Sequence, residues 1–91
     1  IGSLTNLTEL KLDSNQLTRL PPDIGKLTRL THLSLEINRL TALPLQVGML
    51  TDLRLLKVND NRLTAIPHTL AKLGKIERLQ MTADWTFRAA Y

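Results

Sequence analysis

Residues 27–49 read LTRLTHLSLEINRLTALPLQVGM, and they decide the fold because their pattern of leucines, one asparagine and one proline recurs on both sides. Residues 4–26 (LTNLTELKLDSNQLTRLPPDIGK) and residues 50–72 (LTDLRLLKVNDNRLTAIPHTLAK) align with this stretch without a gap. Each copy begins 23 residues after the last, since 27 − 4 = 50 − 27 = 23. A fixed period in this range predicts a solenoid, in which each repeat packs only on its neighbours.

The domain organisation follows from the period. We divide the chain into a single array with a partial repeat at 1–3, full repeats at 4–26, 27–49 and 50–72, and a degenerate or capping repeat at 73–91. Ile1 and Gly2 match Ile24 and Gly25 one period later. We therefore expect the sequence to be a fragment of a longer protein that begins inside an earlier repeat.

Each repeat changes its hydrophobic period along its length. Leu10 and Leu12 alternate with Glu9, Lys11 and Asp13, and the later copies alternate in the same way. Alternation over so few residues predicts a short strand with one buried face. Successive strands are expected to pair in parallel, because each repeat crosses over and returns in the same direction.

An asparagine and a proline follow each strand at fixed positions. The asparagine has two N–H donors and an acceptor, and it can satisfy backbone groups at a buried turn. We expect Asn15, Asn38 and Asn61 to form a structural ladder. The prolines fix the backbone angle φ and cannot donate a hydrogen bond, which predicts a short helical or 3-10 turn that starts there.

The pattern LxxLxxLxLxxNxLxxLPxxIGx resembles the leucine-rich repeat in its 23-residue form. It is most similar to the intracellular subclass found in Ras-binding scaffolds, in Scribble-like polarity scaffolds and in plant Ras-group proteins. The resemblance implies an α/β solenoid that is curved, with parallel strands on its concave face and short helical or 3-10 turns on its convex face. It also implies a protein partner on the concave face, with a small GTPase or a phosphatase subunit as a possible partner.

The candidate binding residues are those expected to point outward from the concave strands. They are Glu9, Lys11, Asp13, His32, Ser34, Glu36, Leu55, Lys57, Asn59, Arg78 and Gln80. A flanking column beside the asparagines contains Arg39, Arg62 and Trp85. Mixed charges with one apolar residue favour a protein interface, whereas a nucleic-acid groove needs Lys and Arg with aromatics. The alternatives are that Leu55 is an ordinary exposed leucine, that the arginines pair with nearby acids, and that Trp85 is part of a cap.

Composition argues against several other classes. The chain has 12 basic and 8 acidic residues, a net charge of +4, and no cysteine. Without cysteine no disulfide framework exists, which favours a reducing, cytoplasmic setting. No apolar run reaches membrane-spanning length. His32 and His68 lack the spacing of zinc ligands, and no nucleophile–base arrangement is recognisable, so we expect no metal, no cofactor and no enzymatic activity.

We interpret the sequence as a non-catalytic protein–protein interaction module of a scaffold or signalling protein. One alternative is the recognition arm of a kinase, ubiquitin ligase or cyclase whose catalytic domain lies outside this chain. Another is a structural subunit of a large assembly, which would use basic residues expected on the convex face. These bases are Arg19, Lys26, Arg29, Lys72 and Lys75.

Overall fold

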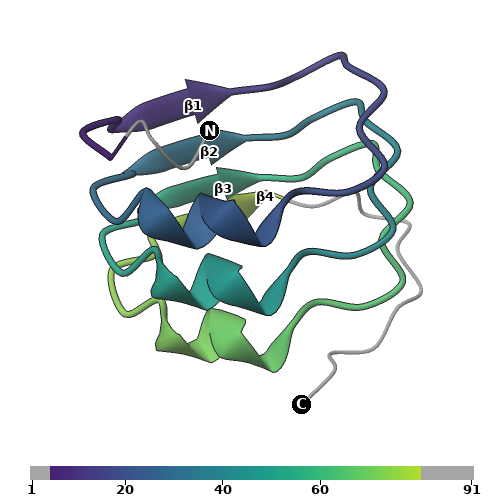
Figure 1. The fold of residues 1–91 in the computed structure, drawn as a ribbon. Coiled ribbons are helices and arrows are strands. Elements are labelled where there is room, and N and C mark those ends of the chain that lie inside the picture. Colours follow the sequence, from purple (N-terminus) through teal and green to yellow (C-terminus); the bar gives the residue numbers. More distant parts are fainter. Residues whose placement is uncertain (1–4, 81–91) are drawn as a thin grey trace.

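The computed structural model describes residues 5–80 of the 91-residue chain. Four strands alternate with three short 3-10 helices. The strands are β1 (Glu9–Lys11), β2 (His32–Ser34), β3 (Leu55–Lys57) and β4 (Arg78–Gln80), and the helices are η1 (Pro22–Lys26), η2 (Leu45–Met49) and η3 (His68–Lys72). Figure 1 shows the strands stacked in one layer and the helical turns stacked in the opposite layer. The predicted solenoid, with parallel strands and 3-10 turns, is therefore confirmed.

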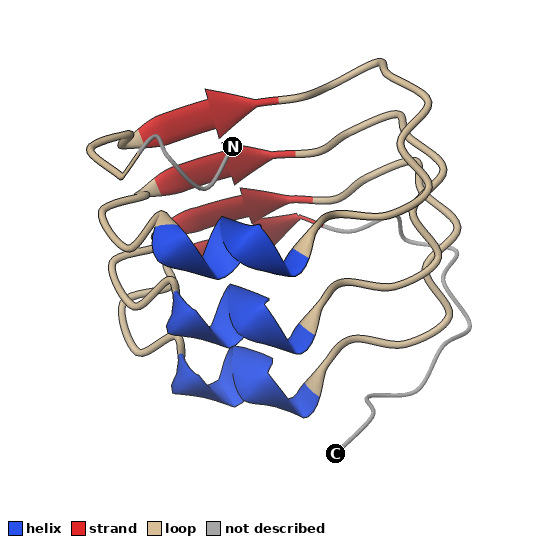
Figure 2. Ribbon diagram, viewed as in Figure 1, coloured by secondary structure: helices blue, strands red, loops and turns tan. Residues whose placement is uncertain are grey.

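The sheet follows the period of the sequence. Its strand order is β1-β2-β3-β4, and every neighbouring pair is parallel. Each residue pairs with the residue 23 positions later, as Leu10 does with Leu33 and Leu33 with Leu56. Long loops connect each strand to the next helical turn (Figure 2). Equivalent side chains consequently form straight columns across the sheet.

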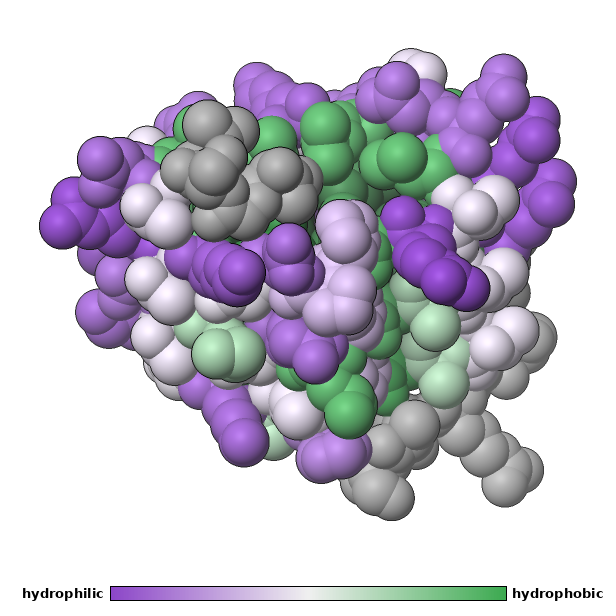
Figure 3. All heavy atoms as spheres, in the orientation of Figure 1, coloured by the Kyte–Doolittle hydropathy of each residue, from purple (hydrophilic) through white to green (hydrophobic). Residues whose placement is uncertain are grey.

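The core lies between the two layers and is almost entirely aliphatic. Leu33 and Leu56 point inward from the sheet and are fully buried, as are Leu30 and Leu53 just before the strands. Figure 3 shows hydrophobic groups exposed near the β1 end of the stack, while most of the surface in this view is hydrophilic or neutral. Leu10, in the first described repeat, is only partly buried. Burial of the strand leucines is therefore more complete in the second and third repeats, which pack between two other repeats, than in the first.

Each helical turn begins immediately after a proline. The φ angles of Pro21, Pro44 and Pro67 are −66°, −68° and −69°. In the first turn, the Ile24 N–H donates to the Pro21 carbonyl at 3.1 Å, a three-residue step that defines the 3-10 helix. Proline suits this position because it fixes φ near the required value and the turn needs no hydrogen from its nitrogen. None of the helices within residues 5–80 is long and apolar enough to cross a membrane.

The close packing of consecutive helical turns requires glycine at one position of the repeat, which Gly25 and Gly48 occupy. A Cβ atom added to Gly48 would lie 2.6 Å from the Cβ of Thr69 on the next turn and 2.7 Å from its carbonyl oxygen. Added to Gly25, it would lie 3.0 Å from the Cβ of Gln46. Neither glycine has a positive φ, so the spacing between repeats, and not backbone freedom, accounts for them.

Asn38 joins two consecutive repeats through its side-chain amide. Its Nδ2 donates to the carbonyls of Leu35 at 3.1 Å and Glu36 at 3.2 Å in its own repeat. The same nitrogen donates to the Leu12 carbonyl of the preceding repeat at 2.9 Å. Its Oδ1 accepts the Leu17 N–H at 3.2 Å. Asn38 thus satisfies backbone groups on both sides of one interface.

The other two asparagines make related contacts. Asn61 repeats all four bonds of Asn38 one period later. Among the described residues, Asn15 bonds only to the Leu12 and Asp13 carbonyls of its own repeat, and it is exposed. The equivalent position in the fourth repeat, and the predicted cap with Trp85, lie outside the described residues. The three asparagines therefore differ in how many contacts they make within residues 5–80.

Candidate functional site

The candidate site is the solvent-facing side of the sheet, called the sheet face below. It corresponds to the predicted concave face, and its strand residues stand in two columns because each strand is paired in register with the next. The first column is Glu9, His32, Leu55 and Arg78, and the second is Lys11, Ser34, Lys57 and Gln80. The structure thus brings eight of the predicted binding residues onto one surface.

Asp13 and Ser34 are part of the internal structure of this face. The Ser34 hydroxyl donates to Asp13 Oδ1 at 2.7 Å, and the Glu36 backbone N–H donates to the same oxygen at 2.8 Å. Ser34 is only 7% exposed. The expectation that Ser34 points freely outward was therefore wrong, because its hydroxyl is used to bind Asp13 of the preceding repeat. Asp13 and Ser34 therefore contribute hydrogen bonds that join two repeats beneath the sheet face.

Glu36 and Lys57 connect the second and third repeats across the same face. Lys57 Nζ lies 3.4 Å from Glu36 Oε1, and both side chains are partly exposed. A partly exposed pair of this kind contributes at most about 1 kcal/mol to stability. Lys11 is exposed and makes no side-chain hydrogen bond or ion pair with any residue among 5–80. Asn59, half-buried, follows β3 by two residues.

His32 is held by a threonine from its own repeat. Its Nδ1 lies 2.8 Å from the Thr31 hydroxyl, and that hydroxyl donates to the Thr8 carbonyl at 3.1 Å. The Thr31 hydroxyl therefore lies between the His32 ring and the Thr8 carbonyl. Glu9 Oε1 lies 4.0 Å from His32 Nδ1. The Nε2 atom, on the other side of the ring, makes no hydrogen bond with a residue among 5–80 and is available to a partner.

Two shallow hollows meet at His32 and Leu55. One has a volume of about 210 Å³ and also includes Glu9, Lys11 and Lys57 in its lining. The other has a volume of about 280 Å³, and its lining also includes Arg54, which precedes β3, with Glu77 and Arg78 just before and at the start of β4. Leu55 is half-buried, so it forms an apolar floor surrounded by charged side chains. An apolar centre with a polar rim is the usual arrangement of a protein interface.

The sequence did not identify Arg54 and Glu77 as site residues. Both stand one position before their strands, where the first two repeats have Thr8 and Thr31. The signal available in the sequence was the change from threonine to a charged residue in the same column. These two residues widen the site toward β4.

The flanking column lies at the turn that follows each strand. The backbone N–H of Arg39 donates to the Leu17 carbonyl at 2.8 Å, and that of Arg62 donates to the Leu40 carbonyl at 2.9 Å. Both side chains are exposed and make no hydrogen bond or ion pair with another residue of the described part of the chain. Of the nearby acids with which these arginines could have paired, Glu36 pairs with Lys57 instead. Trp85 lies outside the described residues.

Ile37, two positions before Arg39, was not identified from the sequence. It is 53% exposed, and its φ of 58° lies in the left-handed region. Ser14 and Asp60, the equivalent residues, have the same φ. Short polar residues tolerate this conformation, whereas a β-branched residue there is an outlier. Its apolar side chain at a position otherwise occupied by Ser and Asp was the available signal.

Several of the polar groups of the sheet face, as far as the described residues show them, bind one another. The Ser34 hydroxyl donates to Asp13, and no hydrogen bond connects it to His32 in the structure. Within residues 5–80, no group of three His, Asp or Glu side chains could hold a metal ion. His68, the other histidine, lies on η3 in the opposite layer. What the face offers is charge, hydrogen bonding and a small apolar floor.

Comparison with known proteins gives a consistent result. A family model for two copies of leucine-rich repeats matches residues 5–47, and a second leucine-rich-repeat model matches residues 28–84. No curated protein matches the chain in sequence. A solved leucine-rich-repeat protein from Leptospira interrogans is similar, with 36% identity and a TM-score of 0.87 over 89% of this chain. The chain spans 21% of that protein's length.

A second solved structure has the same fold at lower identity. It is the leucine-rich-repeat ectodomain of a receptor kinase from Arabidopsis thaliana, with 24% identity and a TM-score of 0.68. The alignment covers 94% of this chain and 61% of the ectodomain. The similarity to this ectodomain extends to the fold alone.

Proposed function

Since the chain belongs to the leucine-rich repeat family, whose fold is typically a non-catalytic interaction module, we propose that it binds a protein partner on the sheet face. The observation that supports this most is the meeting of the two hollows at His32 and Leu55. Leu55 supplies an apolar contact at the centre, and the surrounding charges supply specificity.

The charge pattern indicates what kind of partner fits. Around Leu55 the face presents Lys57 and Arg78 together with Glu9 and Glu77. Such a surface requires a partner with both acidic and basic groups, arranged around an apolar side chain that can cover Leu55. Nucleic acid has only negative charge on its backbone and matches this pattern poorly.

The finer parts of the proposal rest on the repeat pattern and on composition. We include in it a scaffold or signalling role in the cytoplasm, with a small GTPase or a phosphatase subunit as the partner class. Resemblance to the intracellular 23-residue subclass and the absence of cysteine support these parts. The Arabidopsis ectodomain has the same fold, so the fold by itself does not assign the compartment.

The test compares two leucine substitutions on opposite layers. Leu55→Glu places a charge at the floor of the hollows, and Leu45→Glu places the same charge on an exposed position of η2. Each variant is used as bait in cell extract beside the unchanged chain, and captured proteins are identified by mass spectrometry. We expect one protein to be lost with Leu55→Glu and kept with Leu45→Glu, and circular dichroism must show that both variants are folded.

Two results would contradict the proposal. A partner lost with Leu45→Glu and kept with Leu55→Glu would move the interface to the helical layer. A partner retained by both variants at unchanged affinity would exclude Leu55 as a contact. In the supporting case, isothermal titration with the purified partner should give at least a tenfold weaker Kd for Leu55→Glu, since burying an unpaired charge costs more than about 1.4 kcal/mol.

A further inference from the structure

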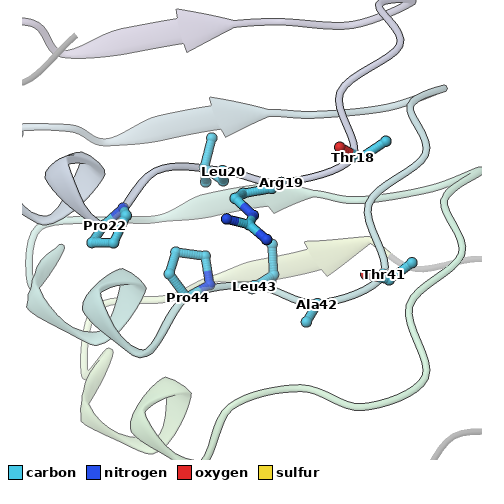
Figure 4. Close-up of a pocket in the computed structure, with 8 residues that line it drawn as sticks. All are labelled: Thr18, Arg19, Leu20, Pro22, Thr41, Ala42, Leu43 and Pro44. Carbon is cyan, nitrogen blue, oxygen red and sulfur yellow. The ribbon is translucent and has the colours of Figure 1, made fainter.

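A separate pocket lies between two consecutive loops, away from the strands of the sheet face. It has a volume of about 510 Å³, which exceeds that of either hollow described above. Its walls come from the segments 18–22 and 41–44, which lead into η1 and η2. Figure 4 shows these segments running one above the other, with the Arg19 side chain extending between them. We refer to it as the loop pocket.

The base of the loop pocket is apolar. Leu20 and Leu43, 3% and 6% exposed, lie at the bottom, and the rings of Pro22 and Pro44 form one end. In Figure 4 the side chains of Thr18 and Thr41 stand at the other end. Both threonines are exposed, and neither hydroxyl makes a hydrogen bond with another residue among 5–80. The pocket thus combines an aliphatic base with two available hydroxyl groups.

Arg19 gives the loop pocket its charge. Its side chain extends from the first loop toward Leu43 and Pro44 of the next repeat (Figure 4). It is exposed and makes no hydrogen bond or ion pair with any residue of the described part of the chain. No acidic residue lines the pocket. An unpaired guanidinium above an apolar base favours an anion, and its planar shape matches a carboxylate through two parallel N–H bonds.

The repeat pattern shows that this arrangement belongs to one interface. One and two periods after Arg19 the chain has Ala42 and Ala65. The short side chain of Ala42 leaves space under the arginine, and the following interface carries no arginine in this column. The charged pocket therefore arises from the pairing of Arg19 with Ala42, and not from the leucine-rich-repeat pattern in general.

We propose that the loop pocket binds the C-terminal carboxylate of a peptide whose last residue is aliphatic. Arg19 binds the carboxylate, and the side chain of that last residue packs against the rings of Pro22 and Pro44 above the buried leucines. A terminal residue carries its carboxylate and its aliphatic group on the same carbon, which matches a guanidinium directly above an apolar base. An internal Asp or Glu has its carboxylate at the tip of the side chain, without an aliphatic group beside it. This inference concerns a different surface from the proposed function and does not depend on it.

The experiment uses two small probes that differ only in charge. N-acetyl-leucine has the carboxylate and the aliphatic side chain, and N-acetyl-leucinamide has the same side chain without the charge. Each is titrated into the whole 15N-labelled chain while amide chemical shifts are followed. For the acid we expect a Kd on the order of 1–10 mM, with shifts concentrated in residues 18–20 and 41–43, and at least tenfold weaker binding of the amide.

Three variants make the result specific. Arg19→Gln should weaken binding of the acid about tenfold or more, and Arg29→Gln, another exposed arginine, should leave it unchanged. Ala42→Leu should fill the pocket and abolish binding of both probes. All three positions are exposed, so the fold is expected to persist, and the dispersion of the amide spectrum verifies it.

Several outcomes would overturn the proposal. They are equal binding of the acid and the amide, unchanged binding by Arg19→Gln, shifts spread over many basic residues, and no shift at probe concentrations of about 50 mM, well above the expected Kd. Shifts centred on His32 and Leu55 would also overturn it, because they would place the probe on the sheet face. A failure of the loop pocket would leave the proposed partner surface untouched, since no residue is shared between the two.

Discussion

Replacing Asn38 by leucine should destabilise the fold more than the same change at either of the other two repeat asparagines. The side chain is 7% exposed and takes part in four hydrogen bonds. A leucine of similar size can fill the space but can make none of these bonds. The expected loss therefore depends on which backbone groups keep another partner.

Three of the four backbone groups that bond to Asn38 keep another hydrogen-bond partner when Asn38 is replaced by leucine. The Leu12 carbonyl still accepts from Asn15, and the Leu35 carbonyl still accepts from Asn61. The Glu36 carbonyl still accepts the Ser14 N–H at 2.9 Å. The Leu17 N–H loses its acceptor and becomes unpaired in a half-buried position.

These contacts set the size of the effect. Each lost hydrogen bond contributes about 1 kcal/mol, and an unpaired N–H costs about 1 kcal/mol more. Burial of the leucine side chain offsets about 2 kcal/mol of this. The net expected loss is about 3 kcal/mol, which for a domain of this length lowers Tm by roughly 12–24 °C.

The assay is thermal unfolding followed by circular dichroism, with three companion variants. Asn61→Leu should cost somewhat less, because Asn61 makes the same bonds but is more exposed. Asn15→Leu should cost about 1 kcal/mol or less, since that residue is exposed and makes two bonds. Asn59→Leu, a control whose side chain makes no hydrogen bond with a residue among 5–80, should change Tm by only a few degrees. If Asn38→Leu melts within a few degrees of Asn59→Leu, or above Asn15→Leu, the reasoning is refuted.

Three further changes test other features by the same denaturation measurement. Ile37→Asn should stabilise the chain by about 1 kcal/mol, because asparagine tolerates the positive φ of 58° better than a β-branched residue. A lower stability would show that the Ile37 side chain makes more packing contacts than its exposure suggests. Gly48→Ala should lower the free energy of unfolding by about 2 kcal/mol, because the added Cβ would clash with Thr69. Gly74→Ala should be close to neutral, because no atom lies within 4 Å of the added Cβ. Equal losses of stability in the two variants would contradict the packing argument. Leu56→Ala should cost about 2–5 kcal/mol, since the side chain is fully buried in the third repeat, and a loss below 1 kcal/mol would mean that the layers close over the cavity.

The fold was predictable from the sequence because the information is repeated. Each strand is only three residues long, and a single alternation such as Glu9–Leu10–Lys11 would be a weak signal. Three copies at a constant spacing predict the parallel register, since a shift by one residue would expose every inward leucine. The prolines also located the starts of the helical turns correctly.

The character of individual site residues was much less predictable. Ser34 was expected to be exposed, and the period could not show that Asp13, 21 residues earlier, accepts its hydroxyl hydrogen. The positive φ of Ile37 could not be predicted, because a hydrophobic residue next to Asn38 does not by itself indicate a strained backbone. The loop pocket depends on a long side chain above a short one, and the period aligns Arg19 with Ala42 but does not show that a hollow remains between their loops.

The constant spacing of the contacts between repeats has a consequence for how such a chain can change in length. The side-chain bonds that join one repeat to the next span 21, 23, 24 or 26 residues, as between Asn38 and Leu17 or between Asn38 and Leu12. Tandem duplication of residues 27–49 would therefore add a layer whose hydrogen-bond partners are already present on both sides. In a globular fold a 23-residue insertion must be accommodated in a surface loop, whereas here it would extend the sheet by one strand and the outer layer by one turn.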